Sequence, residues 1–166
     1  RRIFKIREIE ESRTLQYAGL ALLFGYFLMV SRFSAFGDFT VNAVSEGRHL
    51  CWPFFPSCGD FYFLTVLPLG HSQVLVYALL MGLLLLGVAA FFQKRWVLFH
   101  SLILAFFLWQ MLVMGMSMRL ALTYWYFIAI NAVPFLFLHN KLLFMRLTMV
   151  VAYVLPATIK FDGGWI

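Results

Sequence analysis

Lys160 is the side chain in this sequence that is best placed to do chemistry. It ends a long apolar run and is followed by Asp162 and Trp165. A lysine that leaves an apolar helix is partly desolvated, which lowers its pKa and lets it act as a base, with Asp162 in support. In the alternative interpretation, Lys160 lies at a membrane interface, extends into water and pairs with Asp162. The sequence leaves both interpretations open.

Four side chains are candidates for binding a lipid or an anionic substrate. Arg119 lies between two apolar segments, where it either binds an anionic headgroup or anchors a turn. Tyr124 and Trp125 belong to an aromatic run that forms either a pocket for a quinone or lipid or the aromatic belt of a membrane interface. Trp165 is the fourth candidate. These residues leave the cofactor open, with a quinone or a lipid as the candidates.

Cys51 and Cys58 do not form a CxxC motif and have no pair of histidines nearby, so we predict no metal site. They form a local disulfide if their loop lies outside the cytoplasm, or else remain two free, packed thiols. Haem ligation between helices needs two histidines at matching depths, which the four histidines do not offer. We expect His100 to be a hydrogen-bonded packing residue.

The composition is that of a membrane protein. Apolar residues make up 63% of the 166 positions and charged residues 12%, whereas soluble domains have about 25% charged residues. A soluble fold of this size could not bury so many apolar side chains. We attribute the net charge of +6 to loops that set the orientation in the membrane, and exclude nucleic acid as a partner.

Five apolar segments approach the roughly 20 residues that a helix needs to cross a bilayer. The predicted spans are residues 15–33, 72–92, 96–117, 120–138 and 142–159. The sequence thus predicts an all-α, polytopic membrane bundle over residues 15–166, and we expect it to be part of a longer chain. Residues 1–14, with five basic and three acidic groups, form either an amphipathic helix on the membrane surface or a solvated extension of the first span.

The long aromatic loop at residues 34–71 separates the first two spans. Its second half is too apolar to be a solvated linker, so we expect it to pack on the bundle or enter the membrane interface. Within the later spans, Asn131 with Pro134, and Pro156, mark helix irregularities. Such breaks either line a cavity or are ordinary features of membrane helices.

The distribution of Lys and Arg predicts the orientation. With the N-terminus in the cytoplasm, nine of these residues fall on the cytoplasmic side and four on the other. This places the cysteine loop and Lys160 on the outer or lumenal side. We therefore expect a multi-pass membrane protein with its N-terminus in the cytoplasm.

The segment from Tyr153 to Trp165 resembles a motif of the vitamin K-dependent gamma-carboxylase family and of the related bacterial horizontally transferred transmembrane (HTTM) domains. Lys160, Asp162 and Trp165 reproduce its K-x-D-x-x-W spacing after a helix that begins with Tyr. The order of the spans and the long aromatic loop are also similar. In the carboxylases this lysine is the base that deprotonates vitamin K hydroquinone on the lumenal side, which is the side that the Lys and Arg count gives to Lys160.

The sequence also departs from that family. Pro156 and Ala157 replace an Ala-Gly pair, and residues 122–124 lack the family's Asn-His pair. The large lumenal domain is absent from these residues. The resemblance therefore implies a divergent bacterial relative in a bacterial inner membrane. We expect it to serve as a membrane subunit or anchor of a larger assembly, with other membrane proteins and the bilayer as partners. The alternatives are an enzyme that uses Lys160 as a base on a quinone-like or lipid substrate, and a transporter.

Overall fold

The computed structural model describes residues 6–35, 52–54, 69–116 and 123–161, with side chains for 6–31, 52–54, 77–112, 114–115 and 126–154. These residues form six α-helices and no strand, so the all-α prediction is confirmed for them. The helices are α1 (Ile6–Glu11), α2 (Arg13–Ala35), α4 (Leu69–Phe92), α5 (Trp96–Met116), α6 (Thr123–Phe137) and α7 (Lys141–Phe161). The predicted segments 15–33, 72–92 and 142–159 lie within α2, α4 and α7. The segment 96–117 extends one residue past α5, and 120–138 begins outside the described residues.

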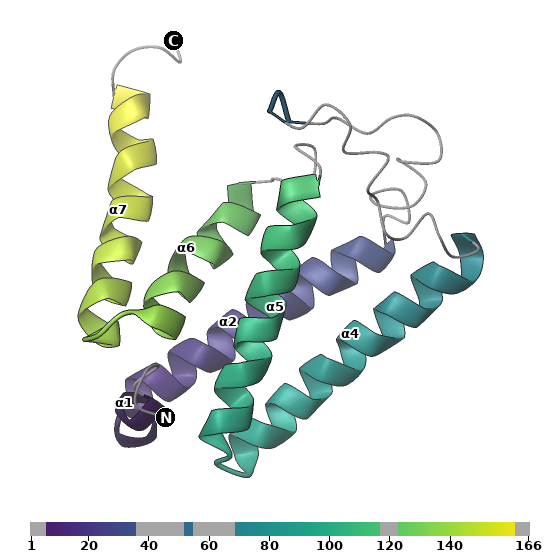
Figure 1. Ribbon diagram of the computed structural model, residues 1–166. Coiled ribbons are helices and arrows are strands. Elements are labelled where there is room, and N and C mark those ends of the chain that lie inside the picture. Colours follow the sequence, from purple (N-terminus) through teal and green to yellow (C-terminus); the bar gives the residue numbers. More distant parts are fainter. Residues whose placement is uncertain (1–5, 36–51, 55–68, 117–122, 162–166) are drawn as a thin grey trace.

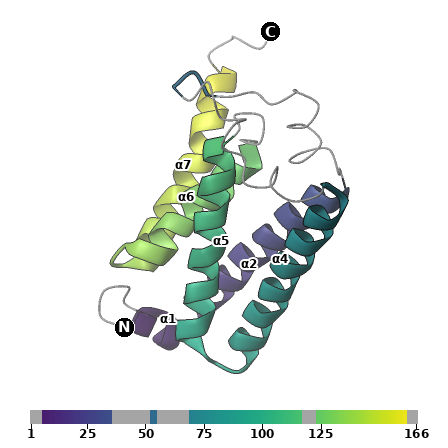
Figure 2. The same ribbon diagram turned by 45° about the vertical axis from the view of Figure 1, so that its right-hand side comes forward.

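The long helices alternate in direction along the chain (Figures 1 and 2). α1, the turn between α4 and α5, and the turn between α6 and α7 lie at one end of the bundle, which we call the α1 end. The C-terminal ends of α2, α5 and α7 lie at the opposite end. Because α7 ends at Phe161, the backbone of Lys160 belongs to the end that is far from α1.

α2 is the central helix, since it packs against each of the other described helices. Small residues on α2 allow these close approaches. A Cβ atom at Gly19 would lie 2.7 Å from ring atoms of both Phe99 and Phe135, and one at Gly25 would lie 3.2 Å from Ile128. Phe99 and Phe135 thus fill the space that Gly19 leaves.

Tight turns with left-handed residues join α4 to α5 and α6 to α7. In the first turn, Lys94 has a φ of 56°, its N–H donates to the Phe91 carbonyl, and the Arg95 N–H donates to the Ala90 carbonyl. This is the Schellman arrangement, which satisfies carbonyls that the end of α4 would otherwise leave without donors. In the second turn, Asn140 has a φ of 55°. Asn tolerates this region better than most residues.

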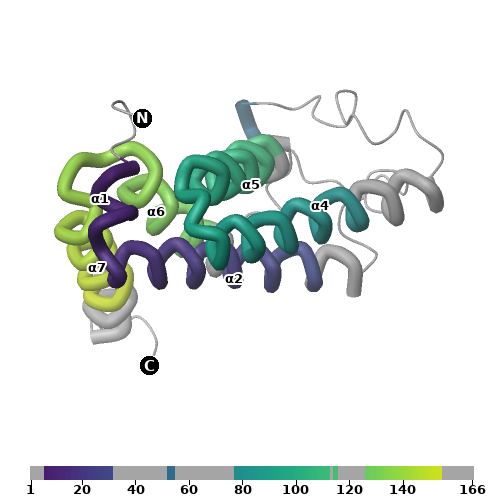
Figure 3. The backbone as a smooth tube through the Cα atoms, turned by 90° about the horizontal axis from the view of Figure 1, so that it is seen from below, coloured from purple at the N-terminus to yellow at the C-terminus, as the bar shows by residue number. Residues whose placement is uncertain are grey.

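The N-terminal segment folds back on the bundle instead of continuing α2. Ile6 and Ile9 of α1 are buried, at 4% and 0% exposure, and α1 packs against α2 and α5. Seen from below, α1 lies across the ends of the longer helices (Figure 3). Ile6 and Ile9 therefore face the protein. In an amphipathic helix that lies on a membrane, the apolar side chains would instead face lipid.

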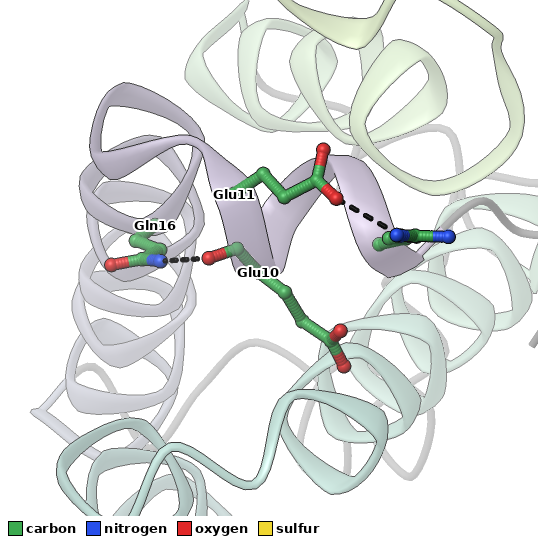
Figure 4. Close-up of polar contacts among 4 residues, drawn as sticks. Glu10, Glu11 and Gln16 are labelled. Atoms are coloured by element: carbon green, nitrogen blue, oxygen red, sulfur yellow. Dashed lines mark hydrogen bonds and ion pairs between the residues drawn. The ribbon is translucent and has the colours of Figure 1, made fainter.

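Gln16 holds the bend between α1 and α2. Its side-chain N–H groups donate to the carbonyls of Ile9 and Glu10 at 3.0 and 3.1 Å, at the C-terminal end of α1. Figure 4 shows the bond to Glu10. Ser12, between the two helices, accepts a hydrogen bond from the Leu15 N–H at 3.4 Å and acts as the N-cap of α2. Gln16 and Ser12 therefore stabilise the bend through hydrogen bonds to the end of α1 and the start of α2.

One helical stretch with described side chains, Arg13–Ser31, is long and apolar enough to cross a membrane. The stretches Tyr77–Phe92, Trp96–Leu112 and Tyr126–Phe137 are apolar but shorter. A buried core helix or a signal sequence also passes this test, so the finding is weak support for a membrane location. Five crossings, with the predicted orientation, remain a prediction.

The long loop contacts the bundle through Trp52. Its indole N–H donates to the carbonyl of Met114 at 2.8 Å, near the C-terminal end of α5, and its ring stacks on Phe54 at 5.6 Å. At least this part of the loop packs on the bundle, as the apolar sequence predicts. The Met114 carbonyl is one of the last four of its helix, which have no partner within the helix.

Replacing Trp52 with Phe is expected to lower the stability of the folded protein by about 1 kcal/mol, because the ring is kept but the donor to Met114 is lost. Thermal denaturation in detergent measures this change. Replacing Phe54 with Leu, which keeps the hydrogen bond, is the control. An equal loss in both variants would mean that ring stacking, and not the hydrogen bond, holds the loop.

Candidate functional site

Described side chains form an apolar groove between α2, α6 and α7, with a volume of about 530 Å³. We call it the α2–α6–α7 groove. Its walls are Ala18, Ala21, Leu22, Phe24, Gly25 and Leu28 of α2, Phe127, Ile128 and Asn131 of α6, and Met145 and Met149 of α7. None of these eleven side chains is titratable. The arrangement is suited to binding an apolar group and provides no acid or base within its described walls.

Asn131 is the only polar side chain among these lining residues, and it is 2% exposed. Its side-chain N–H donates to the Phe127 carbonyl at 2.8 Å, and its carbonyl oxygen faces the Thr148 hydroxyl of α7 at 3.4 Å. That hydroxyl donates to the Met145 carbonyl at 2.9 Å. Asn131 therefore does line a cavity, as the sequence allowed, but α6 continues through Pro134 to Phe137 as one helix.

A second polar cluster lies at the α1 end and centres on Lys141, whose side chain is fully buried. Its ammonium group donates to the carbonyls of Phe135 and Leu136 at 2.7 and 3.4 Å. Its backbone N–H donates to the Glu8 carboxylate at 3.3 Å. The cation thus caps the C-terminal end of α6, and the carboxylate lies at the N-terminal end of α7, both favourable to the helix dipoles.

His100 belongs to the same cluster. It is 2% exposed, its Nε2 lies 3.3 Å from the Leu136 carbonyl, and its ring stacks on Phe135 with centroids 6.2 Å apart. The prediction of a hydrogen-bonded packing residue is confirmed. Together, Glu8, His100 and Lys141 join α1, α5, α6 and α7.

The role of Lys141 was missed at the sequence level, where it counts as one more basic residue of a polar turn. Its position directly after Asn140 was the available signal, because Asn is common where a helix ends and a cation just past that end can reach the last carbonyls. The cluster occupies a helix junction with no adjoining described cavity, and we interpret it as structural.

Tyr26 of α2 is the clearest unsatisfied polar group. Its side chain is fully buried and stacks on Phe106 at 5.3 Å, and its hydroxyl has no hydrogen-bond partner among the described residues. A buried hydroxyl without a partner costs about 1–3 kcal/mol.

Replacing Tyr26 with Phe is therefore expected to raise the unfolding midpoint in detergent, because the ring contact with Phe106 remains and the unpaired hydroxyl is gone. Tyr17, which is 64% exposed, provides the control, and its replacement by Phe should change little. A loss of stability in the Tyr26 variant would show that the hydroxyl has a partner in the membrane.

The residues proposed from the sequence fall mostly outside the described part of the chain. Those outside it altogether are Cys51, Cys58, Arg119, Asp162 and Trp165. Tyr124 and Trp125 lie in the first turn of α6, and Lys160 in the last turn of α7, with only their backbones described. Lys160 is eleven positions beyond Met149, which corresponds to about 16 Å along the helix. The groove and the proposed base therefore lie at different levels of α7.

Comparison with family models, with curated proteins and with solved structures found no match to this chain.

Proposed function

We propose that the chain is a multi-pass membrane protein with five crossings, and that it serves as a membrane subunit or anchor of a larger assembly. The observation that supports this most is the outward-facing apolar surface. Large apolar side chains are exposed on α2, α4, α5, α6 and α7, including Phe24 at 59%, Leu85 at 67%, Leu108 at 57%, Ile130 at 48% and Val150 at 58%. A soluble protein rarely exposes such a surface. Hydrocarbon is the solvent that fits it.

The alternation of the helices supports the orientation in this proposal. The α1 end carries Arg7, Lys94 and Arg95, and α7 begins there with Lys141. The rule that basic residues favour the cytoplasmic side then assigns the α1 end to the cytoplasm. Lys160 belongs to the opposite end.

The role as a subunit is supported by α7. This helix packs mainly on α6 and to a smaller extent on α2. Side chains over most of its circumference are exposed, including Leu143, Leu147, Val151, Tyr153 and Val154. Such a peripheral helix has the surface to receive another membrane protein. The K-x-D-x-x-W spacing supports the HTTM-like assignment within the same proposal.

Membrane fractionation tests the first part of the proposal. The protein is expected to stay in the membrane pellet after an alkaline carbonate wash and to require detergent for extraction. Gentle solubilisation from the native membrane, followed by size-exclusion chromatography, tests the second part. Elution as a free monomer with no partner would contradict the subunit role, and release by carbonate would contradict the membrane location.

An enzyme with Lys160 as the base is the second candidate, because α7 carries both this lysine and two walls of the α2–α6–α7 groove. Turnover of a quinone or lipid substrate that is unchanged in a Lys160→Ala variant would end this hypothesis.

A further inference from the structure

We infer that the α2–α6–α7 groove holds one acyl chain of an anionic phospholipid from the leaflet at the α1 end, whose phosphate is bound by Arg146. This inference rests on the proposed membrane location. It adds a ligand of defined chemistry and a residue that selects it.

The walls of the groove favour hydrocarbon. Ten of the eleven lining side chains are apolar, and the groove opens at the surface between exposed residues such as Phe24 and Met149, at 59% and 41% exposure. In a bilayer, no water is available to fill such a space. Asn131 and Thr148 are hydrogen-bonded to each other and to their own helices, so a chain that passes them breaks no bond.

The length of the groove suits one hydrocarbon chain. Along α2 the lining runs from Ala18 to Leu28, which corresponds to about 15 Å of helix. This is about half of the roughly 30 Å hydrocarbon thickness of a bilayer, so the groove extends over about one leaflet. A single acyl chain from the leaflet at the α1 end matches that length.

Arg146 provides the charge for the headgroup. It is exposed, it follows the lining residue Met145, and it lies one turn before Met149 on the half of α7 nearer the α1 end. In the described part of the chain no carboxylate pairs with it. A long arginine side chain can extend from within the membrane to the phosphate level, and its guanidinium binds phosphate through two parallel hydrogen bonds. The leaflet at the α1 end can therefore supply the phosphate.

Photocrosslinking in lipid nanodiscs tests the inference. A benzophenone amino acid replaces Met149 in the groove, or Leu85 on the exposed face of α4 as a control, and each protein is placed in equal parts of phosphatidylglycerol and phosphatidylcholine. We expect the Met149 probe to capture phosphatidylglycerol about fivefold more than phosphatidylcholine, in keeping with one basic residue at an anionic headgroup. The Leu85 probe should capture the two lipids nearly equally.

Two variants separate the chain from the headgroup. Arg146→Gln is expected to remove the preference for phosphatidylglycerol without lowering total lipid capture, whereas Arg7→Gln, at an exposed arginine paired with Glu11, should leave the preference intact. Ala21→Trp, which fills the groove, should lower total capture at Met149. The inference would be overturned if the Met149 probe, with Arg146 and Ala21 unchanged, captured both lipids equally or captured a protein in place of lipid. Failure of the protein to enter nanodiscs would instead overturn the proposed membrane location.

Discussion

Replacing Gly19 with Ala is expected to destabilise the bundle by about 1–3 kcal/mol, the range for overpacking of a well-packed core. The added methyl group would lie 2.7 Å from atoms of both Phe99 and Phe135, closer than real contacts allow. Phe99 and Phe135 are both fully buried, so neither ring can turn into open space. Because α2 packs against every other described helix, this clash would disturb the α2 contacts with α5 and α6 together.

Gly82→Ala is the matched control, since a Cβ atom there would meet nothing within 4 Å. This variant should be as stable as the original protein or slightly more stable, because Ala favours the helix more than Gly does. Thermal denaturation of the two variants in the same detergent makes the comparison. Equal midpoints for the Gly19 and Gly82 variants would contradict the packing described for α2.

Replacing Lys141 with Met is expected to cost about 3 kcal/mol, because it removes a buried cation and leaves its backbone partners in place. The carbonyls of Phe135 and Leu136 would lose the ammonium donor in a region that water does not reach. A methionine matches the length of the lysine side chain, so the loss reflects the hydrogen bonds more than the volume. The unfolding midpoint and the protease sensitivity of the α6–α7 turn are the measurements.

Lys94→Met tests whether loss of a basic residue alone has this effect, since Lys94 is exposed in the other turn at the α1 end. We expect little change in its midpoint. If the Lys94 and Lys141 variants lost stability equally, the capping role of Lys141 would be wrong, and a general effect of charge on membrane insertion would explain both results.

The positions of the helices could be predicted from the sequence because they follow from local properties. Continuous apolar stretches bounded by polar groups such as Gln93-Lys94-Arg95 give both the helices and their turns. The sequence left open whether the chain bends before the first span, and it did not predict the bend at Ser12, because this depends on hydrogen bonds from Gln16 to the carbonyls of Ile9 and Glu10. The sequence also did not predict which side of each helix faces α2. Helices that are apolar on all sides show little periodicity in hydrophobicity from which the packed side could be identified.

The candidate site, too, could be predicted only in part. The Asn131 and Pro134 pair predicts an irregular helix that can border a cavity, and Asn131 does line the groove. The partner helices α2 and α7 could not be identified, because the groove depends on small side chains such as Ala21 and Gly25 that carry no functional signal of their own. Lys141 was missed for a related reason. Its burial depends on where α6 ends and where α1 packs.

The proposed function depends most on how the chain threads through the membrane, which cysteine labelling measures directly. In a background with Cys51 and Cys58 replaced by Ser, single cysteines are placed at Gln93, His139 or Lys160 and exposed to a membrane-impermeant maleimide in intact spheroplasts. We expect labelling at position 160 without permeabilisation, and labelling at positions 93 and 139 only after it. Labelling of position 160 from the same side as positions 93 and 139 would contradict this threading.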